Sequence, residues 1–151
     1  MFCKEWTLYK MYARAGNINK IIRMNISSAS ERSSYDPASF GPALWFTLHN
    51  ATTAYPEIPD FHTQQAMQQL LTNMHLLIPC GLCKQHWSQT LQKFDLNYIT
   101  KSRENLFTFL VHVHNFVNQM SQKPQMSIED AKELYGYNRK GFGSIVSIKY
   151  V

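Results

Sequence analysis

Residues 78–86 read Ile78-Pro79-Cys80-Gly81-Leu82-Cys83-Lys84-Gln85-His86 and contain the break between two predicted helices. They hold two of the three cysteines of the chain. Pro79 ends a preceding helix, because proline lacks the backbone N–H that a helix interior needs. In the first turn of the next helix, unpaired N–H groups and the helix dipole favour a thiolate. By itself the Cys-x-x-Cys pair predicts either a dithiol redox centre or half of a zinc site, so the surrounding sequence has to decide.

On both sides of this stretch, apolar residues recur at helical spacing after residues that cap helices. The sequence shows no alternation of strands and helices. It therefore predicts an all-α fold, a four-helix bundle with a short fifth helix and a loop at about residues 95–101. The predicted helices cover residues 37–55 after the cap Asp36, 61–77 after Asp60, 80–94, 103–122 after Ser102, and 128–136 after Ser127.

Three of these helices carry an apolar stripe that is expected to face the core. Beside the first stripe, Trp45 and His49 form an i, i+4 pair, so that both side chains can face one ligand. The stripes are Phe40, Leu44, Leu48 and Ala51 in the first helix; Met67, Leu70, Leu71, Met74 and Leu77 or Ile78 in the second; and Leu106, Phe109, Leu110, Val113, Phe116, Val117 and Met120 in the fourth.

Charge divides the chain into a folded domain and two basic tails. The formal net charge is +5, but the excess of Lys and Arg lies at the two ends. This placement argues against a nucleic-acid-binding face, which needs basic residues gathered on the folded body. We expect a flexible basic extension at 1–35, a helical domain at 36–137 and a tail at 138–151. Residues 1–26 loosely resemble a transit peptide; the alternatives are a disordered leader or an extension upstream of a true start at Met24.

Membrane and metal roles find little support in the sequence. No apolar run approaches the ~20 residues of a membrane span. A structural zinc site needs four N or S ligands. His112 and His114 are two residues apart on a predicted helix, so their side chains point about 200° from each other and cannot bind one zinc ion together. A thioredoxin-like dithiol follows a strand, which the predicted all-α fold does not provide. A buried, inert cysteine pair remains as a further alternative. The candidate zinc ligands are Cys80, Cys83, His86, His112 and His114.

A longer pattern places the cysteines in context. In order, the chain contains Gly41-x-x-x-Trp45-x-x-x-His49, Tyr55-Pro56, Pro79-Cys80-x-x-Cys83, His114-Asn115-x-Val117-Asn118 and Lys123-Pro124. This order and spacing closely resemble the Erv/ALR family of FAD-linked sulfhydryl oxidases over about residues 40–137. The resemblance implies noncovalent FAD at the mouth of the bundle and a homodimer formed through the first helices. The implied flavin contacts are Gly41, Trp45, His49, Tyr55, Cys83, His114, Asn115, Val117, Asn118, Lys123 and Tyr135.

The resemblance also implies thiol oxidase chemistry with Cys80 and Cys83 as the catalytic pair. A substrate thiolate would attack Cys80, the more exposed member, and Cys83 would pass the electrons to the flavin, with oxygen as acceptor and peroxide as product. The implied partners are protein dithiols or a thioredoxin-like shuttle protein, with no nucleic acid. The alternative is a flavin-free helical interaction module whose cysteines and histidines bind zinc.

The chain departs from the family pattern at several positions. Val111 stands where many cellular members have a structural cysteine, and Tyr135 stands where the family has a tryptophan. The tails lack the second Cys-x-x-Cys pair of many cellular members, and we expect Cys3 to be an ordinary free thiol. Gly41-Pro42-Ala43-Leu44-Trp45 is similar to the versions encoded by large DNA viruses. A late virion protein, located in the virion or host cytoplasm, is therefore expected, with the mitochondrial intermembrane space as the alternative.

Overall fold

The helices begin where the capping residues predict. In a computed structural model, which describes residues 35–138, the Asp36 carboxylate accepts the N–H of Ala38, and Pro37 occupies the first helical position. Such a cap satisfies an N–H group that the helix itself cannot pair. Asp60, Ser102 and Ser127 cap the later helices in the same way. The predictions for the two tails fall almost wholly outside the described residues.

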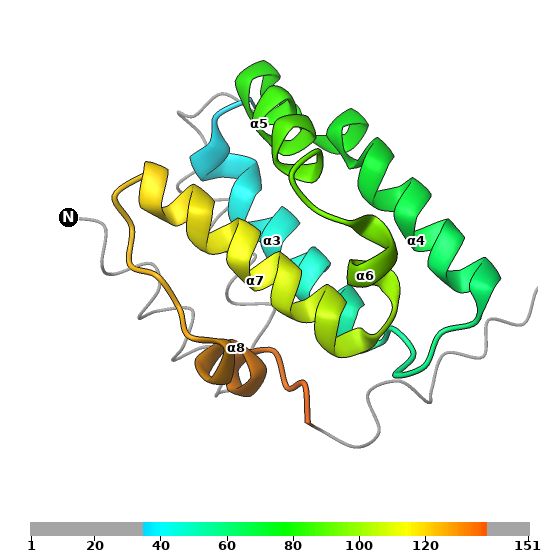
Figure 1. Cartoon of the computed structure of the whole chain (residues 1–151). Coiled ribbons are helices and arrows are strands. Elements are labelled where there is room, and N and C mark those ends of the chain that lie inside the picture. The colour runs from blue at the N-terminus through cyan, green and yellow to red at the C-terminus, as the bar shows by residue number, and fades with distance from the viewer. Residues whose placement is uncertain (1–34, 139–151) are drawn as a thin grey trace, which may run out of the picture.

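The all-α prediction is confirmed for residues 35–138, which contain no strand. α3 and α7 lie side by side, α4 packs on α5 and α6, and the short α8 lies across α7 (Figure 1). Within this part of the chain no helix is long and apolar enough to cross a membrane. The elements are α3 (Pro37–Thr53), α4 (Phe61–Asn73), the 3-10 helix η2 (Met74–Leu77), α5 (Gly81–Leu91), α6 (Leu96–Thr100), α7 (Arg103–Met120) and α8 (Ile128–Leu134).

The prediction of a loop at 95–101 is wrong. Asp95 caps the short helix α6 by accepting the N–H of Asn97, and Ile99 is buried in the core. The predicted second helix is also divided, because the chain tightens into η2 after Asn73. This change rotates the following residues, so that Ile78 is buried while Leu77 is exposed.

Some members of the predicted stripes do not face the core. Ala51, Leu70, Phe116 and Met120 are exposed. The core includes the other members of the stripes that are buried, together with Trp87 of α5. These buried residues are Leu48, Leu71, Met74, Ile78, Trp87, Leu106, Phe109, Leu110 and Val113.

α7 is buried on a second side that the stripe did not predict. Phe107 and Val111 pack against Ala131 of α8 in a separate apolar cluster. Lys132 of α8 also pairs with Glu104 of α7, with 2.6 Å between Nζ and Oε1. Val111 thus provides apolar packing in this cluster, and packing holds α8 against α7.

Candidate active site

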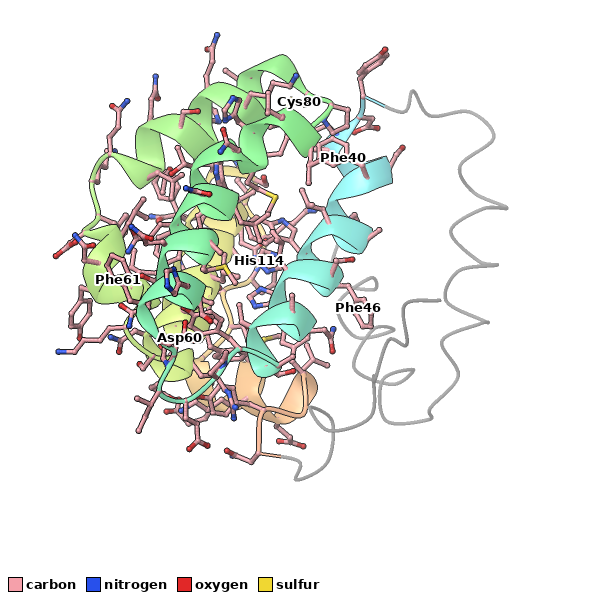
Figure 2. The ribbon with its side chains drawn as sticks, turned by 90° about the vertical axis from the view of Figure 1, so that its right-hand side faces the viewer. Phe40, Phe46, Asp60, Phe61, Cys80 and His114 are labelled. Atoms are coloured by element: carbon pink, nitrogen blue, oxygen red, sulfur yellow. A yellow bond between two sulfur atoms is a disulfide. The ribbon has the colours of Figure 1, made fainter. Side chains whose placement is uncertain are left out.

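Cys80 and Cys83 form a disulfide at the start of α5. Pro79 separates η2 from α5, and Cys80 has the extended backbone of an N-cap residue. Its Sγ accepts the backbone N–H of Cys83 at 3.2 Å, and the two Cα atoms are 5.2 Å apart. Both residues are half-buried at one end of the bundle, where Cys80 lies near the beginning of α3 (Figure 2).

A cavity of about 340 Å³ opens beside this disulfide, between α3, α5 and α7. Its size lies within the usual range for small-molecule and cofactor sites. Cys83 lines the cavity, so the redox pair is continuous with its wall. The other predicted site residues that line it are Gly41, Trp45, His114, Val117, Asn118, Lys123 and Tyr135.

Aromatic and imidazole rings are stacked along one side of the cavity. Trp45 of α3 and His114 of α7 are nearly parallel, with ring centroids 4.2 Å apart and an interplanar angle of 5°. His49 stacks on Tyr135, which follows α8, at 4.4 Å. The Nε2 atom of His49 lies 3.1 Å from Nδ1 of His114, which joins the two ring pairs by a hydrogen bond. Figure 2 shows His114 in the interior of the bundle.

Both histidines are neutral near pH 7. Burial lowers the pKa of His49 to about 4. Burial, followed by repulsion from the His49 ring when it is protonated and from the Lys123 ammonium, lowers the pKa of His114 to about 3. One neutral ring therefore donates to the other, and Nδ1 of His49 is left buried without a hydrogen-bond partner. A small void of about 10 Å³ behind the rings is lined by His49, His114, Asn115 and Tyr135.

Three predicted flavin contacts, His49, Tyr55 and Asn115, do not line the cavity, and His49 borders only the small void behind the rings. The Tyr55 hydroxyl donates to the carbonyl of Thr100 at 2.9 Å, and its ring is buried beyond the far end of α3. Asn115 holds the loop before α8, because its amide donates to the carbonyl of Met126 at 2.7 Å and accepts the Met126 N–H at 2.9 Å. Tyr55 is thus a core residue, and the Asn115 amide serves the α7–α8 connection.

The disulfide, the ring stack and most of the residues that line the cavity lie within a region that a known family shares. The family model described as "Erv1 / Alr family" matches residues 42–136. The chain belongs to the Erv1/Alr family. The FAD-linked sulfhydryl oxidase designated 096R of Invertebrate iridescent virus 3 is 32% identical over 102 residues, which cover 68% of this chain and 69% of that protein.

Further relatives and solved structures extend this result. The FAD-linked sulfhydryl oxidase designated 088R of Frog virus 3 is 28% identical over 117 residues, or 76% of this chain and 77% of its own length. The crystal structure of the yeast Erv1 core superposes with a TM-score of 0.64 at 22% identity, covering 73% of this chain and 92% of that one. This structural likeness confirms the Erv1-type helical fold.

The cavity suits the flat aromatic group and the phosphates of FAD. Rings prefer offset stacking on other rings, and the nearly parallel Trp45 and His114 offer such a surface. Lys123 lines the cavity and can neutralise phosphate charge. The Asn118 side chain also faces it and donates to the carbonyl of Pro124 at 3.2 Å, which fixes the amide. The unpaired Nδ1 of His49 marks a polar position that the protein leaves unsatisfied.

Several cavity-lining residues of this Erv1/Alr member were not assigned to the site from the sequence. His86 lies three residues after Cys83 and so on the same face of α5, a spacing that could have identified it. Phe116 and Met120 line the cavity although they were expected in the core, which explains why they are 43% and 47% exposed. His112, a candidate zinc ligand, is exposed on α7. Among residues 35–138 no three His, Cys, Asp or Glu side chains are grouped to hold a metal ion.

Proposed function

We propose that this protein is an FAD-dependent thiol oxidase that introduces disulfides into protein dithiols. The observation that carries the proposal is the position of Cys83, which is disulfide-bonded to Cys80 and lines the same cavity as the stacked rings of Trp45 and His114. A dithiol centre and a flat aromatic binding surface thus line one cavity. Membership in the Erv1/Alr family and relatives named FAD-linked sulfhydryl oxidases support the same activity.

Cys80 is proposed to receive the substrate. A substrate thiolate attacks Sγ of Cys80, the Cys80–Cys83 bond breaks, and Cys83 leaves as a thiolate. The substrate's second thiolate then attacks the mixed disulfide, which releases an oxidised substrate and leaves Cys80 reduced. The N–H of Cys83, which already points at Sγ of Cys80, stabilises negative charge on that sulfur.

Cys83 and the ring residues are proposed to face the cofactor. When bound, FAD would supply two-electron redox chemistry, with oxygen as the final acceptor and peroxide as the product. Trp45, His114 and Tyr135 would orient its rings, and Lys123 would hold its phosphates. The neutral state of His49 and His114 keeps positive charge away from the stacking surface while leaving ring nitrogens for hydrogen bonds.

The assembly and location of the protein are proposed from its relatives. A homodimer is proposed from the family resemblance of the sequence. We propose a location in a virion or in host cytoplasm, because the first relatives belong to Invertebrate iridescent virus 3 and Frog virus 3. The mitochondrial intermembrane space is the alternative, since fungal relatives are named mitochondrial sulfhydryl oxidases. Static light scattering and imaging of the tagged full chain in infected and uninfected cells test these two points.

Oxygen uptake tests the activity directly. The purified full chain should be yellow, and dithiothreitol should start oxygen consumption with one peroxide formed per disulfide. Cys80→Ser should reduce this rate to that of free FAD, whereas the matched variant Cys3→Ser should retain it. Colourless protein with stoichiometric zinc would instead favour the interaction module.

A further inference from the structure

Exposed leucines adjoin the disulfide on both sides along the chain. Leu76 and Leu77 of η2 are each 67% exposed, and Leu82, between the two cysteines, is 61% exposed. We define these three residues as the leucine patch. η2 packs directly against α5, so the two parts of the patch lie on adjoining elements with Pro79 and Cys80 between them.

The leucine patch is not needed to hold this end of the bundle together. Met74 and Ile78 supply the buried contacts of this segment, and Trp87 of α5 donates its indole N–H to the carbonyl of Leu71 at 2.8 Å. Single exposed leucines are ordinary on protein surfaces, but apolar residues gathered at one place mark an interaction site more often. Here the place is the redox disulfide, which another thiol has to reach.

The charge around the leucine patch is one-sided. No Asp or Glu occurs between Phe61 and Phe94, a stretch that includes α4, η2 and α5, whereas Lys84 directly follows Cys83. Asp36, at the start of the neighbouring α3, is engaged in capping Ala38. An approaching thiolate or a carboxylate beside it therefore meets no carboxylate from these three elements, and the charged residue nearest to the disulfide in the sequence is a lysine.

We propose that the leucine patch docks the cysteine-bearing segment of a substrate protein, and that this segment has apolar residues beside its cysteines and is neutral or acidic. The proposal rests on the proposed function and specifies its substrate class. In the exchange, the substrate's two thiols become a disulfide, the Cys80–Cys83 disulfide becomes two thiols, and two protons pass with the two electrons. The patch holds the segment while its first sulfur bonds to Cys80.

The rates at which the enzyme oxidises three different dithiols distinguish substrate docking from the thiol–disulfide exchange itself. We would compare dithiothreitol with two twelve-residue peptides that share a central Cys-x-x-Cys, one flanked by leucines and glutamates and one by serines and lysines. The double variant Leu76→Ser/Leu77→Ser should lower kcat/KM for the leucine peptide about tenfold relative to dithiothreitol, because two exposed apolar contacts are lost. Ile58→Ser is the matched control, since Ile58 is 92% exposed but precedes α4, away from the disulfide, and it should leave the ratio unchanged.

Each other outcome has a distinct meaning. A wild-type enzyme that oxidises both peptides equally well, or a double variant with an unchanged ratio, would overturn the docking proposal while leaving the oxidase intact. A fall in oligomer mass in the double variant would also overturn it, because the patch would then join two copies of the chain. Failure of the wild type to oxidise even dithiothreitol would refute the proposed function itself. Leu82→Asn, assayed with the same three dithiols, provides a second variant for the same ratio.

Discussion

The two ends of the bundle are built in opposite ways. At the far end, hydrogen bonds close the structure: Tyr55 donates to Thr100, Gln68 donates to Thr100 Oγ1 at 3.0 Å, and the Arg103 guanidinium contacts both the Tyr55 carbonyl and Glu57. At the disulfide end, an apolar cavity opens and leucines are exposed. Cys80 and Asp60 lie near opposite ends in Figure 2.

This difference separates stability from function along the same helices. α3 contributes Gly41 and Trp45 to the open end, and the chain that leaves it contributes Tyr55 to the closed end. An open cavity forgoes packing contacts, so the remainder of the fold has to provide the stability. We therefore expect substitutions at the closed end to change unfolding, and substitutions at the open end to change cofactor binding.

The largest effect expected on stability is a loss on acidification caused by the buried histidines. The pKa values of His49 and His114 lie at about 4 and about 3, below 6.5 for an unfolded histidine. Below pH 6.5 the unfolded chain binds more protons, so stability should fall as the pH drops from 6.5 to 5, by up to ~1.4 kcal/mol per pH unit for each histidine. Denaturant unfolding of the apoprotein measures this slope.

The double variant His49→Phe/His114→Phe should flatten the same slope. The lowered pKa values of Asp60 and Glu104 contribute only at more acidic pH, so the window from pH 6.5 to 5 isolates the histidines. An equal slope in the wild type and the double variant would mean that the two rings are charged or exposed, in conflict with a neutral stack.

At the open end, Trp45→Leu should weaken flavin binding about tenfold, because the stacking surface is lost while an apolar side chain remains. Quenching of FAD fluorescence on titration with apoprotein measures the affinity. The Tm of the apoprotein should change little in comparison. A large fall in Tm with unchanged affinity would assign Trp45 to the core instead.

At the closed end, Tyr55→Phe should lower the free energy of unfolding by about 1–2 kcal/mol, because the buried carbonyl of Thr100 loses its donor. Flavin affinity should stay within about twofold. Measured in the same way as for Trp45→Leu, stability should therefore fall while flavin affinity is retained. Loss of flavin binding in Tyr55→Phe would return Tyr55 to the cofactor site and remove the distinction between the two ends.

The sequence predicted the long helices and the composition of the open end well, for local reasons. Asp36, Asp60, Ser102 and Ser127 act through neighbouring N–H groups, and Trp45 and His49 share a face because they are four residues apart. Tyr135, which was predicted as a flavin contact, carries a ring that stacks on His49.

The remaining features depend on contacts between distant residues. α6 has only five residues, too few for a helical pattern, and exists because Asp95 caps it and Ile99 reaches the core. The partner of Asn115 could not be predicted, because the loop that carries Met126 returns to α7 only in the folded chain. Tyr55 was assigned by its place in the motif, but its hydroxyl lies against a carbonyl 45 residues away in the sequence.

The central claim is that Cys83 is the member of the disulfide that contacts a bound flavin. The visible absorbance spectrum of Cys80→Ser, measured beside that of Cys83→Ser, tests it most directly. With Cys80 removed, the Cys83 thiolate should lie against the oxidised flavin and produce a broad long-wavelength charge-transfer band that disappears on acidification. Cys83→Ser should bind flavin without this band. A flavin-loaded Cys80→Ser protein with no such band, or the same band in Cys83→Ser, would contradict the account.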